Sequence, residues 1–166
     1  MTRSVSVGAG VRLAIVAAVI ALTTVGCSSS SSSSGGALTP NATIFAQNFQ
    51  FHNVPATLPS GVVMLLFQNQ ESFPIEHEMI PIALPSGKTA QDVINDAKQK
   101  QAASEDDWLH IGGDFGTAPT NGGLIEILNL PPGNYAFACW QTGTQSGGEN
   151  GPTHASKGMV QAFTVS

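Results

Sequence analysis

Short apolar runs separated by proline and glycine fill most of the sequence, and this pattern constrains the fold more than any other feature. Val62–Phe67 is a continuous apolar run, which is typical of a buried strand. Leu124–Leu128 and Tyr135–Cys139 lie on either side of the turn Pro131-Pro132-Gly133, and Met159–Val165 forms a closing strand. About seven short strands with such turn signals predict an all-β Greek-key sandwich or barrel.

Two longer segments complete the predicted strands. Ile75–Leu84 contains a proline at an interior position, which suits an edge strand or a bulge because proline cannot donate to the ladder. Thr43–Phe51 carries phenylalanine at odd positions, namely at Phe45, Phe49 and Phe51. Alternate residues of a strand point to the same face, so we expect these three rings in the core.

One short inserted helix interrupts the strands. Thr89 can cap its amino end, and Asp92 follows three residues later, as in a capping box. The helix is expected to end near Gln101, before a run of acidic residues. Its apolar stripe is Val93, Ile94 and Ala97.

The first residues have the layout of a secretory signal. Arg3 and Arg12 precede the apolar run Leu13–Val25, which is too short for a comfortable membrane span. Thr24-Val25-Gly26-Cys27 resembles the lipobox of bacterial lipoproteins, and that resemblance implies lipidation of Cys27 and a bacterial source. An uncleaved N-terminal anchor is the alternative. Both interpretations export the rest of the chain and hold it at the extracytoplasmic face of the cell membrane.

The sequence therefore divides into three parts. Residues 1–26 are predicted to be a lipoprotein signal peptide. Residues 27–40 contain a run of serines and two glycines, whose side chains cannot form a core, and they predict a flexible tether. Residues 41–166 are about 126 residues long, which is enough for one domain and too short for two.

Charge excludes one class of partner. Both arginines lie in the signal segment, so the remaining chain has four lysines against eleven acidic residues. Binding to nucleic acid needs clustered basic side chains, and none are present. We expect no nucleic-acid partner.

The number of cysteines constrains the role of Cys139. If Cys27 carries lipid, Cys139 is the only other cysteine and cannot close an internal disulfide. In an exported protein a solitary exposed thiol is a liability. Cys139 is therefore either an inert buried thiol or a metal ligand.

Three other residues could join Cys139 at a metal site. Alternation places Tyr135, Phe137 and Cys139 on one face of their strand, with the thiol at the end of the core. The candidates are His77, His154 and Met159. Two imidazoles, a thiolate and a thioether form the ligand set of blue-copper electron-transfer sites. Taken singly, each residue has a structural interpretation as well.

The order of these residues resembles a known family. The segment Leu130–Cys139, followed by His154 and by Gly158-Met159-Val160, is similar to the carboxyl-terminal half of the plastocyanin-like cupredoxins. Asn69 followed by His77 resembles their first-ligand region. The resemblance implies a cupredoxin-like fold, one copper ion, and His77, Cys139, His154 and Met159 as its ligands.

One feature departs from that family. Fourteen residues separate Cys139 from His154, where the family has only a few. Closing the longer loop costs about 1.4 kcal/mol more, which is small beside typical metal-binding energies of about 10 kcal/mol or more. The two remaining histidines, His52 and His110, are interpreted as structural.

These patterns predict a membrane-tethered one-electron carrier that exchanges electrons with an unidentified redox partner. The alternatives are copper capture or delivery at the envelope, and a metal-free cupredoxin scaffold used for protein contact. An enzyme is not expected, because the sequence contains no serine elbow, phosphate loop or zinc-hydrolase motif.

Overall fold

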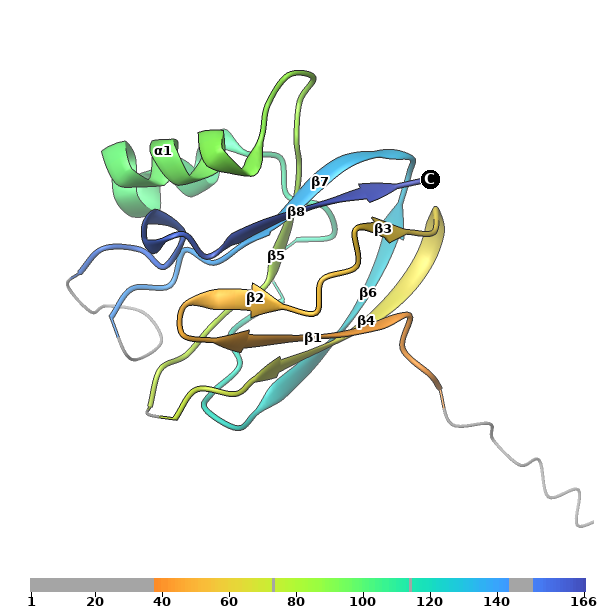
Figure 1. Ribbon diagram of the computed structural model, residues 1–166, viewed down its shortest axis with the longest axis horizontal. Helices are drawn as coiled ribbons and strands as arrows, with labels where there is room; N and C mark the ends of the chain where they lie inside the picture. Colours follow the sequence, from red (N-terminus) through yellow and green to blue (C-terminus); the bar gives the residue numbers. More distant parts are fainter. Residues whose placement is uncertain (1–37, 73, 114, 144–150) are drawn as a thin grey trace, which may run out of the picture. The chain divides into compact units, whose positions relative to one another are not determined.

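The computed structural model describes residues 38–72, 74–113, 115–143 and 151–166, which belong to one compact unit. It consists of two four-stranded sheets and one α-helix (Figure 1). The predicted all-β sandwich with one short inserted helix is therefore confirmed. Cys27, the signal segment and most of the tether lie outside the described residues. No helix among the described residues is long and apolar enough to cross a membrane.

The first sheet has the strand order β2-β1-β4-β6. Its strands are β1 (Ala42–Gln47), β2 (Gln50–His52), β4 (Gly61–Asn69) and β6 (Gly123–Leu130). Strand β1 runs parallel to β4, and β6 pairs antiparallel with β4. Along β4 the side chains of Val63, Leu65 and Phe67 are fully buried, which is the alternation expected for a strand with one face on the core.

The second sheet has the order β3-β8-β7-β5. Its strands are β3 (Thr57–Leu58), β5 (Ile80–Ala83), β7 (Gly133–Ala138) and β8 (Val160–Val165). Tyr135, Phe137 and Cys139 belong to the core cluster between the sheets, as alternation predicted. Strand β5 is shorter than the predicted strand Ile75–Leu84, because His77 makes only an isolated bridge with Ala118 before β5 begins.

The expectation that three phenylalanines share one core face is wrong. The segment Thr43–Phe51 is a hairpin rather than one strand, and Asn48 and Phe49 form its turn with φ of 54° and 57°. Only Phe51 reaches the core between the sheets. Phe45 lies on the opposite face of β1 and stacks on His52, with ring centroids 5.1 Å apart.

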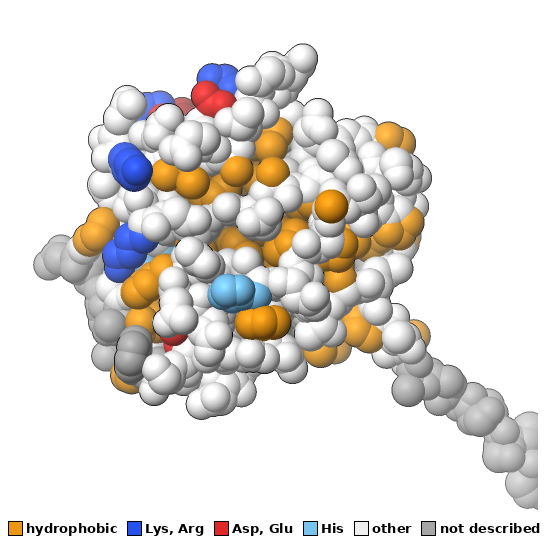
Figure 2. Space-filling view, in the orientation of Figure 1, with side chains coloured by type: hydrophobic (Ala, Val, Ile, Leu, Met, Phe, Trp, Pro, Cys, Tyr) orange, Lys and Arg blue, Asp and Glu red, His pale blue; other side chains and the backbone are white. Residues whose placement is uncertain are grey.

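The helix α1 (Ala90–Lys100) begins and ends as predicted. Thr89 caps it, and the reciprocal bonds of a capping box with Asp92 are present. Val93 and Ala97 are buried against the outer face of the second sheet, near β7 and β8 (Figure 1). The 3₁₀ helices η1 (Gln101–Asp107) and η2 (Ala155–Lys157) were not predicted. On the face in Figure 2, the lysines gather at the end that carries α1 and η2.

Candidate metal centre

Three predicted ligands converge at one end of the sandwich. The Nδ1 atoms of His77 and His154 lie 3.0 Å apart. The Cys139 sulfur lies 3.4 Å from Nδ1 of His154 and 3.8 Å from Nδ1 of His77. All three side chains are completely buried. Among the described residues they form a group whose ligand atoms could hold one metal ion.

The size of this triangle fits a first-row metal ion. A triangle with sides of 3.0, 3.4 and 3.8 Å has its centre about 2 Å from each corner. Bonds from such ions to histidine nitrogen and cysteine sulfur are about 2.0–2.3 Å long. The three donor atoms therefore need little rearrangement to share one ion.

Backbone hydrogen bonds bring Cys139 and His154 together although fourteen residues separate them. The amide of His154 donates to the carbonyl of Gln141 at 2.8 Å, and the amide of Ala155 donates to the carbonyl of Cys139 at 2.6 Å. Thr142 and Thr153 form a further bridge. The base of the long loop is thus closed like a hairpin, so its length does not separate the two ligands. Residues 144–150 of the loop lie outside the described residues.

Met159, the fourth predicted ligand, is tied to the same segment by its backbone. Its amide donates to the carbonyl of His154 at 3.0 Å, and its carbonyl accepts from the amide of Cys139 at 3.3 Å. Its side chain is fully buried in the core cluster that includes Cys139. Coordination by its sulfur remains a prediction.

The hydrogen-bond partners of the two histidines determine which nitrogen carries the proton. Nε2 of His154 lies 3.0 Å from the carbonyl oxygen of Gly143, and a carbonyl can only accept. Nε2 of His77 lies 3.0 Å from Oε1 of Glu71, and an ionised carboxylate also only accepts. Both rings must therefore carry hydrogen on Nε2. In the neutral rings, both Nδ1 atoms are left with bare lone pairs.

Two lone pairs that face each other at 3.0 Å repel unless a cation lies between them. The cation can be a shared proton or a metal ion. Burial lowers the pKa of His154 to about 4 and lowers the pKa of His77 as well. A proton is therefore poorly held at neutral pH, and the site is suited to a metal ion.

Burial raises the pKa of the Cys139 thiol well above its usual value, and the nearby carboxylate of Glu78 adds to the effect. A metal ion reverses this preference, because a coordinating thiol is deprotonated outright. The amide of Glu78 lies 3.5 Å from the sulfur and can donate to it. The carboxylate of Glu78 accepts from the amide of Trp140 at 2.6 Å, which fixes the chain immediately after the cysteine.

Phe49 covers both histidine rings. Its ring meets His154 edge-on at 4.9 Å between centroids and His77 at 5.8 Å. The amino group of Lys157 lies 4.1 Å above the same phenylalanine ring, a cation–π contact. The Phe49 ring therefore contributes to the burial of the two histidines.

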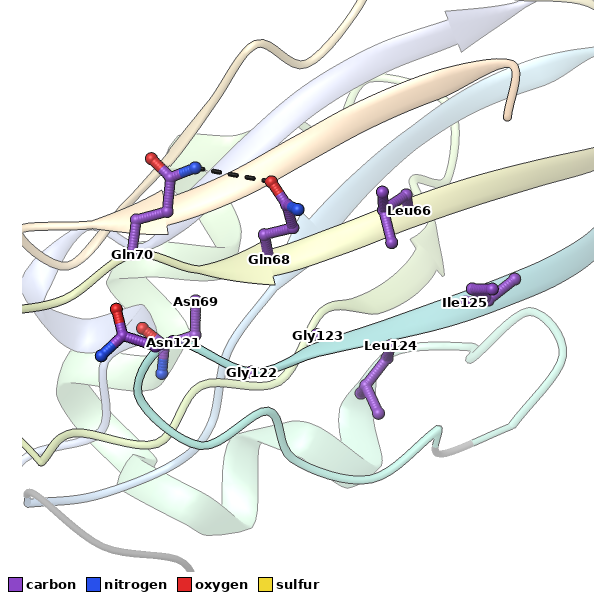
Figure 3. A pocket seen from close by; sticks show the side chains of 9 residues that line it. All are labelled: Leu66, Gln68, Asn69, Gln70, Asn121, Gly122, Gly123, Leu124 and Ile125. Carbon is purple, nitrogen blue, oxygen red and sulfur yellow. Dashed lines mark hydrogen bonds between the residues drawn. The ribbon is translucent and has the colours of Figure 1, made fainter. Parts of the chain in front are cut away.

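The other two histidines lie away from this cluster. His52 stacks on Phe45, and His110 stacks on Trp140 with centroids 5.9 Å apart. The pocket of Figure 3 is also separate from the cluster: it is a hollow between the end of β4 and the start of β6, lined by both polar and apolar residues. Its residue Asn69 is nevertheless connected to the histidine site, because its side-chain oxygen accepts from the amide of Glu71.

Sequence reasoning missed Glu71, Glu78 and Phe49 as parts of the site. Glu71 and Glu78 are buried carboxylates in a chain with few charges. Their position near His77 in the sequence was the only available signal. Phe49 was assigned to the core because the turn at Asn48 was not recognised.

Comparisons with known proteins found similar solved structures at low sequence identity. No protein-family model matches the chain, and no curated protein matches it. A solved structure of reduced auracyanin from Roseiflexus castenholzii is similar at 17% identity, with a TM-score of 0.49. The match covers 75% of this chain and 94% of the auracyanin.

The oxidised plastocyanin of Dryopteris crassirhizoma is similar at 18% identity, with a TM-score of 0.42. That match covers 75% of this chain and all of the plastocyanin. The strand pairing itself shows a two-sheet sandwich, which is the architecture that the sequence resemblance implied.

Proposed function

We propose that this protein is a copper-binding one-electron carrier with a type 1 site formed by His77, Cys139, His154 and Met159. The observation that carries the proposal is the pair of Nδ1 lone pairs that face each other next to the Cys139 sulfur. Two imidazole nitrogens, one thiolate and an axial thioether are the ligands typical of blue-copper sites. When bound, copper would supply a one-electron redox couple.

The protein groups would hold and shield the ion. Hydrogen bonds to Glu71 and Gly143 keep both Nδ1 atoms aimed at the site. Strands β7 and β8 fix the cysteine and methionine segments by their backbones. Phe49 covers the histidine rings on one side and helps to exclude water. A rigid, dry site favours electron transfer because little has to rearrange when the charge changes.

Copper capture and delivery is less well supported by this geometry. Exchange of an ion requires access to its ligands, whereas all three convergent side chains are completely buried. A metal-free scaffold would also leave the opposed histidine lone pairs without a cation.

We further propose that Cys27 anchors the protein to the extracytoplasmic face of the cell membrane through lipid. The sequence from Arg3 to Cys27 supports this location. Expression in a bacterial host with a labelled fatty acid tests it. The label should appear in the wild-type protein and disappear in Cys27→Ala, and an unlabelled wild type would contradict it.

Titration of the full-length protein with Cu(II) tests the function. One equivalent should produce an intense visible charge-transfer band, and Cys139→Ser should remove it. His110→Ala is the matched control and should keep the band. A protein that binds copper without colour would contradict the type 1 site, and one that binds no copper would contradict the whole proposal.

A further inference from the structure

Glu71 is the least expected component of the site. Its Oε1 lies 3.0 Å from Nε2 of His77, and both side chains are almost completely buried. Carboxylates are seldom buried unless they are paired. Glu71 therefore occupies its position because of specific bonds and not because of the general packing.

The position of Glu71 is set independently of the histidine. The amide of Phe49 donates to the same Oε1 at 3.1 Å. The amide of Glu71 donates to Oδ1 of Asn69 at 3.1 Å. The Asn69 side chain in turn donates to the carbonyls of Ile75 and Ala118. The Glu71 carboxylate is thus held in place by groups other than His77.

The two histidines differ in the charge of their partners. Nε2 of His154 donates to a neutral carbonyl, whereas Nε2 of His77 donates to a carboxylate. A carboxylate partner orients a ligand ring and makes its free nitrogen more basic. It also places a buried negative charge one imidazole ring away from the ion.

Other charged groups lie near the site. The amino group of Lys157 lies 4.1 Å from the centre of the Phe49 ring, and the carboxylate of Glu78 accepts from the amide of Trp140. Glu71 bonds directly to a ligand side chain through a carboxylate oxygen. A buried charge acts more strongly on a divalent than on a monovalent ion, because Coulomb energy grows with the ion's charge.

We propose that Glu71 is the positioning residue that orients His77 and biases the site toward the divalent ion. The inference rests on the proposed copper function and deepens it. Copper held here is stabilised as Cu(II) relative to Cu(I), so the reduction potential is lower than it would be with a neutral partner.

Glu71→Gln separates charge from orientation. Glutamine retains an oxygen that accepts from His77 and from the amide of Phe49, but it carries no charge. The visible band should persist, while the ratio of Cu(II) to Cu(I) affinity falls at least tenfold. For a one-electron couple this raises the potential by about 59 mV or more.

Glu76→Gln is the matched control. Glu76 lies next to His77 in sequence, but its carboxylate accepts from Thr117. Its removal should change the potential by clearly less than Glu71→Gln does. Equal shifts in the two variants, or an unchanged potential in a coloured Glu71→Gln protein, would overturn the role of Glu71 and leave the copper function standing.

A second measurement does not depend on copper. Nitrogen NMR of the metal-free protein should show His77 in the tautomer with hydrogen on Nε2. Glu71→Ala should shift His77 toward a mixture of tautomers, while His154 stays unchanged. An unchanged His77 would overturn the orienting role. A wild type that binds no copper would instead remove the function on which the inference rests.

Discussion

His77 and His154 face each other through their Nδ1 atoms at 3.0 Å, and each ring donates from its other nitrogen to a fixed acceptor. The fold sets the orientation of both rings through these two acceptors. One acceptor follows β4 and the other lies in the loop after Cys139. Both rings are thereby held with their lone pairs directed at one point, beside a buried sulfur.

Loss of one ring should remove the metal. His154→Ala leaves two of the three convergent atoms, so copper affinity should fall by more than the roughly 10- to 100-fold typical of second-shell changes. Isothermal titration with Cu(II) measures it. His52→Ala is the control, because that ring stacks on Phe45 away from the site and should leave affinity unchanged. Equal affinities of the two variants would contradict the assignment.

Phe49 should limit exchange of the ion. Its backbone is left-handed, which costs a residue with a side chain about 1–2 kcal/mol relative to glycine. Phe49→Gly should relieve that strain and uncover the histidine rings. The backbone amide at position 49 should still donate its hydrogen bond to Glu71. Removal of copper by a chelator should therefore become several-fold faster, as followed by loss of the visible band.

Asn48→Gly is the matched variant of the same turn. Asn48 has a similar left-handed backbone, but its side chain has no aromatic ring that could cover the histidines. The rate at which a chelator removes copper from Asn48→Gly should stay at the wild-type value. A Phe49→Gly protein that releases copper as slowly as Asn48→Gly would show that the ring is not a cover.

Glu126 should make the stability of the fold depend on pH. Its side chain is fully buried on β6, and within the described part of the chain neither carboxylate oxygen has a hydrogen-bond partner. Burial raises its pKa to about 8, so the folded state keeps a proton that the unfolded state releases near pH 4.5. The free energy of unfolding should therefore fall as pH rises from about 4.5 to 8, by an amount on the order of 4 kcal/mol.

Denaturant unfolding at several pH values checks this dependence. Glutamine at position 126 cannot ionise. The free energy of unfolding of Glu126→Gln should therefore fall much less than that of the wild type across this pH interval. Asp106→Asn removes a charge from an exposed position and should retain the wild-type slope. A decline of the same steepness in Glu126→Gln would contradict the prediction.

Regular elements of this fold could be predicted from the sequence because their signals are local. Alternation placed Tyr135, Phe137 and Cys139 on the core face, and the structure agrees. The capping box at Thr89 fixed the start of α1. The two-sheet class followed from the same strand and turn signals.

The surroundings of the site could not be predicted, because they depend on irregular backbone. The turn at Asn48 and Phe49 places both residues in left-handed conformations, which asparagine adopts readily but phenylalanine rarely does, and it carries Phe49 over the histidines. Glu71 reaches His77 through a loop whose shape depends on the side chain of Asn69. No periodic pattern specifies such contacts.

The fourteen residues between Cys139 and His154 do not keep these two side chains apart. Loop length affects closure only weakly, and the backbone bonds at its base decide where its ends lie. Those bonds form because the loop leaves and returns as a continuation of strand pairing at Thr142 and Thr153.

X-ray absorption of the copper-loaded, full-length protein shows which atoms surround the ion. Two histidine nitrogens and one thiolate sulfur should lie within bonding distance of the copper. Cys139→Ser should remove the short sulfur shell. A copper ion surrounded only by nitrogen and oxygen in the wild type would contradict the convergence of His77, Cys139 and His154 on one metal.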